Sequence, residues 1–251
     1  MHTYDTLFFD YIQTGSSRSA RTVLPLVLAN LPIHSVLDIG CGAGAWLREY
    51  LALGVNDALG VDGDYVQPEQ LLIPGERFLA RNLAQPFDLG RRFDLVQCLE
   101  VAEHLPATHA GTLVDNLTRH SDCILFSAAV PGQGGEYHVN EQPYGYWRDL
   151  FAARGYRLFD GLRPQLREHR EVESWYRYNL LLFVQDSRIP QLPPAMATTR
   201  IADTAPIPDV APLSDRLRRT IMRQLPPVLL TRLAVIKHWL VLRRIRQRPS
   251  N

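Results

Sequence analysis

The sequence predicts an α/β protein with a doubly wound, mostly parallel seven-stranded sheet, an antiparallel edge strand and a C-terminal helical extension. Three observations indicate this fold class. Strand-like apolar runs alternate with helical patterns along most of the chain, which is typical of a parallel sheet. The last two strand-like runs come close together, which favours an antiparallel edge. The first strand-like run leads through a glycine-rich turn into a helical pattern.

The elements follow in a regular order. Residues 17–31 are expected to form a helix because their apolar side chains recur on one face. Strands are expected at 35–39, 58–62, 76–79, 93–99, 121–128, 156–160 and 177–184. Helical patterns separate most of these runs, notably at 44–53, 107–118 and 143–154. We therefore expect one domain over residues 1–186, with residues 1–31 as a helical lid.

The pattern changes after residue 186. Six prolines among small and polar residues predict an extended linker over 187–212. Residues 213–225 and 228–246 are helical in pattern and belong to a basic amphipathic tail, 213–251. This tail holds ten Lys or Arg and one acidic residue, so it carries +9. Because the whole chain has a net charge of +1, residues 1–212 carry about −8.

Composition places the chain among ordinary globular proteins. It has 251 residues, of which 46% are hydrophobic and 21% charged, enough to bury one large core. We expect no signal peptide and no membrane-spanning helix. The cysteines, Cys41, Cys98 and Cys123, are odd in number and lack metal-ligand spacing, which favours buried reduced thiols and a cytoplasmic protein.

The turn after the first strand is the most informative segment. Asp38 lies in an apolar strand that runs into Gly40, Gly42 and Gly44. Glycines at this place permit a tight turn and a close approach of the backbone to a ligand at the start of the next helix. Asp62 ends the next strand about twenty residues on, where an acid can bind a ribose diol. A dinucleotide site would instead need the spacing G-x-G-x-x-G.

The acid followed by G-x-G-x-G resembles motif I of class I S-adenosylmethionine (SAM) dependent methyltransferases. The resemblance implies that Asp38, Gly40 and Gly42 hold the methionine part of SAM and that Asp62 holds the ribose. It places Asn82 and Leu83 beside the adenine, where the family often has an acid, so Asn82 would give a weaker, neutral contact. We also assign cofactor contacts to Gly63 and Leu99 and, with the N-terminal segment as a lid over SAM, to Arg18 near the methionine carboxylate.

An acid and histidine cluster follows the fourth strand. Glu100 and Glu103 lie three residues apart, nearly one helical turn, and His104 comes next. Three roles fit such a cluster: positioning a substrate hydroxyl, general-base catalysis by His104, or binding of a divalent cation. His138 is a further candidate for either chemistry.

The E-x-x-E-H form resembles ubiquinone-type O-methyltransferases and enzymes that methylate RNA 3′ ends, both of which use metals. That resemblance implies Glu100, Glu103, His104 and His138 as ligands, although in many relatives this histidine acts as a base or orders the loop without a metal. Residues 35–184 also resemble uncharacterised methyltransferases from bacterial polysaccharide and secondary-metabolite gene sets, on the run Gly134 to Gln142 and the aromatic helix after it.

These observations predict SAM-dependent methyl transfer to an oxygen of a small molecule, a sugar or glycan precursor, with Glu103, His104 and His138 catalytic. The alternatives are a nitrogen acceptor, or an RNA substrate bound through the basic tail. Arg163 and the run 175–179 either line the acceptor pocket or pack inside the fold. The tail predicts contact with an anionic membrane on its cytoplasmic face, or packing on the body or on a second copy. The acidic body argues against DNA.

Overall fold

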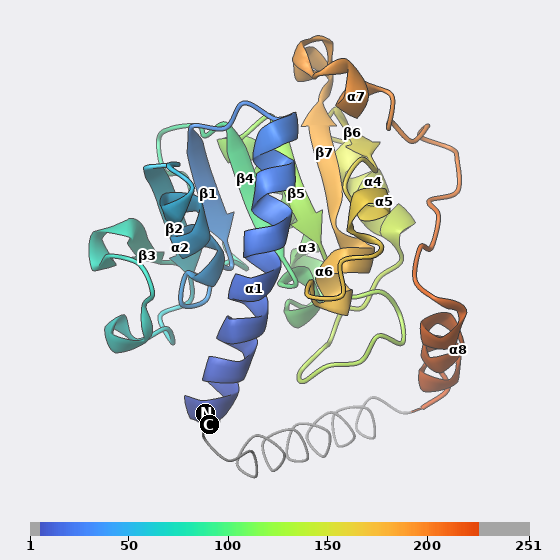
Figure 1. Ribbon diagram of the computed structural model, residues 1–251, viewed down its shortest axis with the longest axis horizontal. Coiled ribbons are helices and arrows are strands. Elements are labelled where there is room, and N and C mark those ends of the chain that lie inside the picture. Colours follow the sequence, from blue (N-terminus) through green and yellow to red (C-terminus); the bar gives the residue numbers. More distant parts are fainter. Residues whose placement is uncertain (1–5, 226–251) are drawn as a thin grey trace.

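The computed structural model describes residues 6–225, and the residues before and after this range are not considered further. Within it lies a seven-stranded sheet with the order β3-β2-β1-β4-β5-β7-β6 (Figure 1). The strands are β1 (Ser35–Ile39), β2 (Asp57–Asp62), β3 (Phe78–Ala80), β4 (Leu95–Leu99), β5 (Cys123–Ser127), β6 (Tyr156–Phe159) and β7 (Leu181–Gln185). Only β7 runs antiparallel to its neighbours, β5 and β6. The predicted fold class is confirmed.

Helices cover both faces of the sheet (Figure 1). They are α1 (Thr6–Asn30), α2 (Ala45–Ala52), α3 (Ala110–His120), α4 (Tyr144–Ala152), α5 (Arg163–Leu166), α6 (Ser174–Asn179), α7 (Pro194–Ala197) and α8 (Leu213–Met222). Alternate strand residues face opposite sides, so two apolar cores form. One joins Val36 to α1, α2 and α6. The other joins Leu37 to α3 and α4. Two-sided burial explains why the strands read as nearly continuous apolar runs.

The first helix is longer than the predicted 17–31. It begins at Thr6, and its N-terminal half extends past the carboxyl ends of the parallel strands (Figure 1). Of the predicted lid, residues 1–5 lie outside the described range, and the lid function stays a prediction. Among the described residues no helix combines the length and the apolar character needed to cross a membrane.

The prediction of a strand over 177–184 is wrong in its first part. Residues Ser174–Asn179 form α6, and β7 begins only at Leu181. Tyr176 and Asn179 are both buried, and the three-residue spacing places them on one face only in a helix. The Tyr176 ring meets the Trp46 ring edge-on at 5.0 Å. Burial of this aromatic side chain therefore outweighs the β-propensity of the run.

The segment predicted as an extended linker, 187–212, packs against the sheet. It contains a short 3-10 helix, Asp186–Gln191, and α7. Met196 is buried in the core, and the Ile201 amide donates to the Leu158 carbonyl oxygen at 2.9 Å beside β6. The prolines and small residues of this segment form local turns that pack on the domain, and they do not form an extended linker. The basic tail is described only as far as residue 225, so the predicted helix 228–246 lies outside the described residues.

Candidate active site

The glycine turn after β1 forms as the sequence predicts. Gly40 has φ +87° and Gly42 has φ +52°, both in the left-handed region that favours glycine. A Cβ on Gly40 would lie 2.2 Å from a methyl carbon of Val101, so the turn packs directly on the loop after β4. A Cβ on Gly42 would meet nothing within 4 Å. The Gly42 backbone therefore borders open space that a ligand can approach.

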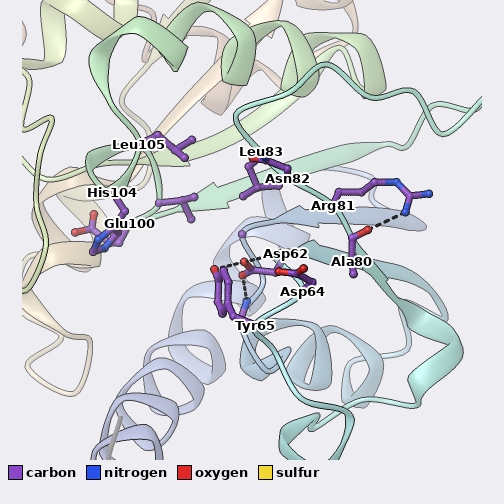
Figure 2. A pocket seen from close by; sticks show the side chains of 14 residues that line it. Asp62, Asp64, Tyr65, Ala80, Arg81, Asn82, Leu83, Glu100, His104 and Leu105 are labelled. Carbon is purple, nitrogen blue, oxygen red and sulfur yellow. Dashed lines mark hydrogen bonds between the residues drawn. The ribbon is translucent and has the colours of Figure 1, made fainter. Parts of the chain in front are cut away.

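This space is a cavity of about 620 Å³ at the carboxyl ends of β1, β2 and β4 (Figure 2). Its lining consists of Gly40, Gly42, Asp62, Gly63, Asp64, Tyr65, Ala80, Arg81, Asn82, Leu83, Glu100, Val101, His104 and Leu105. Ligands of open α/β sheets bind at this edge. Eight residues of the lining are predicted site residues, and Asp38, Leu99, Glu103, His138 and Arg18 are the predicted residues that do not line it.

Asp62 accepts three hydrogen bonds at the mouth of the glycine turn. Its exposed fraction is 4%. One carboxylate oxygen accepts from the Gly42 amide at 2.6 Å, and the other accepts from the Gly63 amide at 2.7 Å. The Tyr65 hydroxyl also donates to the second oxygen (Figure 2). These contacts fix the carboxylate at the mouth of the turn, where it can accept hydrogen bonds from a diol.

Asp38 lies deeper, inside β1, and its exposed fraction is 3%. Burial raises its pKa from 3.8 to about 8; the nearby Gln97 side chain opposes this shift, and the charge of Asp62 adds to it. The side chain is therefore protonated at neutral pH in the free protein. A positively charged ligand group nearby would favour its ionised form.

The predicted adenine contacts lie at the far end of the cavity. Leu83 is buried and offers an apolar wall. The Asn82 side-chain oxygen accepts from the Ala84 amide at 3.0 Å, so its own loop uses part of its capacity. A carbonyl oxygen has two lone pairs, which leaves one for a ligand. This arrangement supports the weaker, neutral contact that the sequence predicts.

Two acidic side chains mark the opposite end of the site. Glu100 follows β4 with φ +55°, a conformation uncommon for a non-glycine residue. Its carboxylate accepts from the Gln133 amide group at 2.9 Å and from that of Asn179 at 3.4 Å. Glu103 is fully buried. Burial raises the pKa of both carboxyl groups, and the charge of Glu100 raises that of Glu103 further.

The two predicted histidines meet beside these acids. The amides of Val139 and Asn140 both donate to the Glu103 carbonyl oxygen, at 2.9 and 3.1 Å, which anchors the glycine-rich loop to the loop after β4. As a result the His104 and His138 rings face each other edge-on, with centroids 5.0 Å apart. Desolvation and the nearby His138 lower the pKa of His104 to about 4, so its ring is neutral near pH 7.

Comparison with known proteins concerns the part of the chain that lines most of the cavity. Residues 11–125 match the family model of a methyltransferase domain, and this range holds the turn, Asp62 and His104. The ubiquinone biosynthesis O-methyltransferase of Pseudomonas syringae pv. tomato is 31% identical over 139 residues, covering 47% of this chain and 57% of that protein. Residues 11–125 form a SAM-dependent methyltransferase domain.

Other relatives of the chain differ in their named substrates. The tRNA U34 carboxymethyltransferase of Hydrogenovibrio crunogenus is 28% identical over 184 residues, covering 61% of this chain and 54% of that protein. The chain thus spans a little over half the length of both curated relatives. Among solved structures, the sugar N-methyltransferase KedS8 from Streptoalloteichus sp. ATCC 53650 aligns with a TM-score of 0.56 at 18% identity, covering 74% of this chain and 96% of that one. The last likeness concerns the fold alone.

The structure adds one residue beside His138 that the sequence did not single out. Glu141 accepts from the amides of Gly132 and Gly134, each at 2.7 Å, and pairs with His138 Nδ1 at 2.9 Å. Burial raises the pKa of Glu141, but the bonds from His138 and the two amides outweigh this and lower it. An ionised carboxylate only accepts, so Nδ1 is the donor in this pair, and in a neutral ring Nε2 is then the nitrogen with the lone pair.

Gly135 leaves room for that ring, because a Cβ there would lie 2.1 Å from His138 Nε2. The sequence signal for Glu141 was its spacing of three from His138, within a loop rich in glycine. Gln133 and Asn179, which hold Glu100, had no such signal.

A divalent cation fits part of the predicted ligand set. Glu103, His104 and His138 each offer a ligand atom, and these atoms lie within 4.8 Å of one another. Among residues 6–225, Glu103 Oε2 is buried and has no hydrogen-bond partner, which fits an atom that can bind a cation. Two imidazoles and one carboxylate suit Mn²⁺, Fe²⁺ or Zn²⁺. Glu100, the fourth predicted ligand, is instead held by Gln133 and Asn179 and lies outside this trio.

The remaining predicted residues lie apart from the cavity. Arg18 borders a separate hollow between α1 and α2 and pairs with Glu173 at 2.6 Å. Leu99 is buried at the end of β4. Arg163 is fully buried and paired with Asp160 at 2.7 Å, so of the two predicted alternatives it packs inside the fold.

The helix α8 packs against the loop that carries Glu141 and His138. Arg223 Nε donates to the Pro131 carbonyl oxygen at 2.8 Å, and an Arg218 nitrogen donates to that of Gln133 at 3.2 Å. A Cβ on Gly132 would lie 2.2 Å from the Arg219 carbonyl oxygen, so the close approach requires glycine. The C-terminal segment thus supports the acceptor side of the site.

Proposed function

We propose that the protein transfers the methyl group of SAM to a hydroxyl oxygen of a small polar acceptor, a sugar or glycan precursor. One observation carries this proposal: a single cavity joins the glycine turn and Asp62 at one end to Glu100 and His104 at the other. A volume of about 620 Å³ falls in the usual range of small-molecule sites. The cofactor and the reacting acceptor atom can therefore share one space.

The residues of this chain have distinct tasks in the proposed reaction. SAM supplies a methyl group on a sulfonium, which is already a good leaving group. Asp62, Gly40 and Gly42 hold and orient the cofactor, which converts an encounter into an aligned displacement. His104 lines the cavity and its ring meets that of His138 edge-on, so we propose that the proton lost by the acceptor hydroxyl, as the new oxygen–carbon bond forms, passes to this histidine pair, with His138 Nε2 as its final acceptor. Glu141 keeps the other ring nitrogen protonated and the ring in place.

The presence of a histidine base in the site favours a hydroxyl oxygen over an amine nitrogen as the nucleophile. A hydroxyl has to lose its proton during transfer, and the site places two imidazoles next to the buried acids. A neutral amine needs less assistance from a base, so a nitrogen acceptor is the nearest alternative. The KedS8 protein, named as a sugar N-methyltransferase, is a reason to include amino sugars among the acceptors tested.

An RNA acceptor is the second candidate. Relatives named as tRNA U34 carboxymethyltransferases favour it, as do the arginines of α8 beside the acceptor loop. RNA binding through arginines would weaken steeply with salt, whereas methylation of a free sugar would not. The two candidates therefore differ in a simple measurement.

The test is incubation of the protein with SAM and panels of sugars, sugar nucleotides, amino sugars and tRNA, followed by mass spectrometry. A product heavier by one methylene, about 14 Da, identifies the acceptor class, and fragmentation assigns the methyl to oxygen or nitrogen. His138→Ala serves as the matched control, because it should keep the cofactor cavity intact. Product from tRNA alone would replace the sugar proposal, and methylation at nitrogen would replace the oxygen proposal.

The tail carries a further part of the proposal. On α8, the side chains of Leu213, Leu217 and Ile221 are 78%, 63% and 58% exposed and recur every four residues. With the arginines of α8, they form a basic amphipathic surface suited to an anionic membrane. We propose this contact at the cytoplasmic face. Loss of co-sedimentation with anionic vesicles after Leu217→Ser would support it, and no sedimentation of the unaltered protein at low salt would favour packing on a second copy.

A further inference from the structure

The Tyr65 side chain occupies the place on Asp62 that a ribose would need. Its hydroxyl donates to the same carboxylate oxygen as the Gly63 amide (Figure 2). The residue is nevertheless 61% exposed, and its ring borders the cavity. An exposed aromatic side chain gains little from burial, and the hydrogen bond to Asp62 is a contact that holds the ring across the cavity.

The hydrogen-bonding capacity of Asp62 sets up a competition. An ionised carboxylate offers about four acceptor positions. Three are already used in the free protein, by the amides of Gly42 and Gly63 and by the Tyr65 hydroxyl. A ribose diol brings two donors, and only one position remains. The two amides belong to the backbone of the turn and cannot leave without unfolding it, whereas Tyr65 can leave by a rotation of its side chain.

Gly63 is the residue that permits this placement. A Cβ built on Gly63 would lie 2.2 Å from Tyr65 Cε1 and 2.5 Å from Cδ1, so the ring lies directly over the Gly63 backbone. Any larger residue at 63 would push the ring away from Asp62. Glycine is not required here by a left-handed conformation, because Gly63 is absent from the positive-φ residues of the described chain. The contact with the ring therefore accounts for it.

We infer that the Tyr65 hydroxyl is an internal competitor of the cofactor ribose, and that it sets the affinity of the site for SAM and S-adenosylhomocysteine. The inference rests on the proposed function in one respect, that Asp62 receives the ribose. When the competent form, with Tyr65 released, is only a fraction of the free protein, the apparent dissociation constant rises by the inverse of that fraction. In the cofactor-bound form the hydrogen bond between Tyr65 and Asp62 is already broken. The competition should therefore slow association of the cofactor and leave its dissociation rate unchanged.

The test is calorimetry with S-adenosylhomocysteine, which requires no acceptor. Tyr65→Phe keeps the ring and removes the donor, so we expect it to bind about threefold to tenfold more tightly than the unaltered protein. Tyr146→Phe removes a hydroxyl from a tyrosine outside the cavity and should change nothing. Stopped-flow measurements on Tyr65→Phe should show faster association with an unchanged dissociation rate.

A double-mutant cycle adds an independent readout. Gly63→Ala should displace the ring and also tighten binding, but should give no further gain in the Tyr65→Phe background, because both changes remove the same contact. If the new methyl group obstructs the cavity itself, Gly63→Ala will weaken binding equally in both backgrounds, and Tyr65→Phe alone then decides. Equal or weaker binding by Tyr65→Phe overturns the inference and leaves the cofactor assignment intact. No binding by either protein overturns both.

Discussion

Replacement of Asp38 by asparagine should stabilise the protein at neutral pH and weaken its binding of SAM. In the folded protein the pKa of Asp38 is about 8, because the side chain is buried, whereas the ordinary value is 3.8. Below pH 3.8 the carboxyl group is protonated in both the folded and the unfolded chain, and folding pays no penalty. As the pH rises toward 8, only the unfolded chain ionises, so the free energy of unfolding falls. Above pH 8 both ionise and the loss stops.

The size of this loss follows from the shift. Each pH unit between the two pKa values lowers the free energy of unfolding by about 1.4 kcal/mol, so the loss at pH 7 is roughly 4 kcal/mol. Asparagine cannot ionise. The stability of Asp38→Asn minus that of the unaltered protein should therefore increase by about 2.5 kcal/mol between pH 5 and pH 7.

Urea unfolding at both pH values, followed by tryptophan fluorescence, measures this increase. All other titrating groups are shared by the two proteins, so their contributions cancel in the difference. A difference that does not change with pH would refute the argument from burial. Calorimetry at pH 7 should show weaker binding of S-adenosylhomocysteine by Asp38→Asn, since the neutral amide cannot pair with the ligand's ammonium group. Stability and cofactor binding would then oppose each other at a single residue.

Four further predictions test other parts of the site. Asp62→Ala removes the proposed acceptor for the ribose diol and should weaken binding of S-adenosylhomocysteine about tenfold to a hundredfold in calorimetry. An unchanged affinity would show that Asp62 does not bind the ribose. Gly40→Ala forces a left-handed alanine against Val101 and should lower the free energy of unfolding by roughly 1–3 kcal/mol in urea, more than Gly54→Ala, which shares the left-handed φ but meets nothing within 4 Å. His138→Ala should lower turnover about 10²- to 10⁴-fold with cofactor affinity unchanged, and Glu141→Gln should lower it in the same direction; full turnover in both would place the proton acceptor elsewhere. If a cation is bound by Glu103, His104 and His138, chelator treatment should abolish turnover and Mn²⁺ should restore it. Full activity in excess chelator would show that no metal is needed for catalysis.

The cofactor half of the site could be predicted because its determinants are local. The turn Gly40 to Gly44 and the acid Asp62 each follow a strand, and the carboxyl ends of adjacent parallel strands meet at one edge of the sheet. Spacing along the chain therefore translates into proximity in space. The matched family model covers this same half and ends at residue 125, inside β5.

The acceptor half was harder to predict because it depends on contacts between distant segments. Nothing in the sequence pairs Asn179 with Glu100, which lie 79 residues apart. Arg163 showed a charge in an apolar context, which fits a pocket as well as a buried ion pair, and only the position of Asp160 distinguishes the two. Tyr65 had no signal at all, since one aromatic residue in a polar loop is ordinary.

The packing of α8 on the glycine-rich loop means that cofactor binding and catalysis depend on different parts of the chain. A chain that ended at residue 212, before α8, would keep the whole sheet, the segment 187–212 that packs on it, the glycine turn and Asp62. It would lose the arginine side chains that hold the carbonyl groups of Pro131 and Gln133, and with them the support of the loop that carries His138. Such a shortened protein should behave as a cofactor-binding protein without catalysis. Capture of SAM and its chemical use would thus be encoded in separable stretches of the sequence.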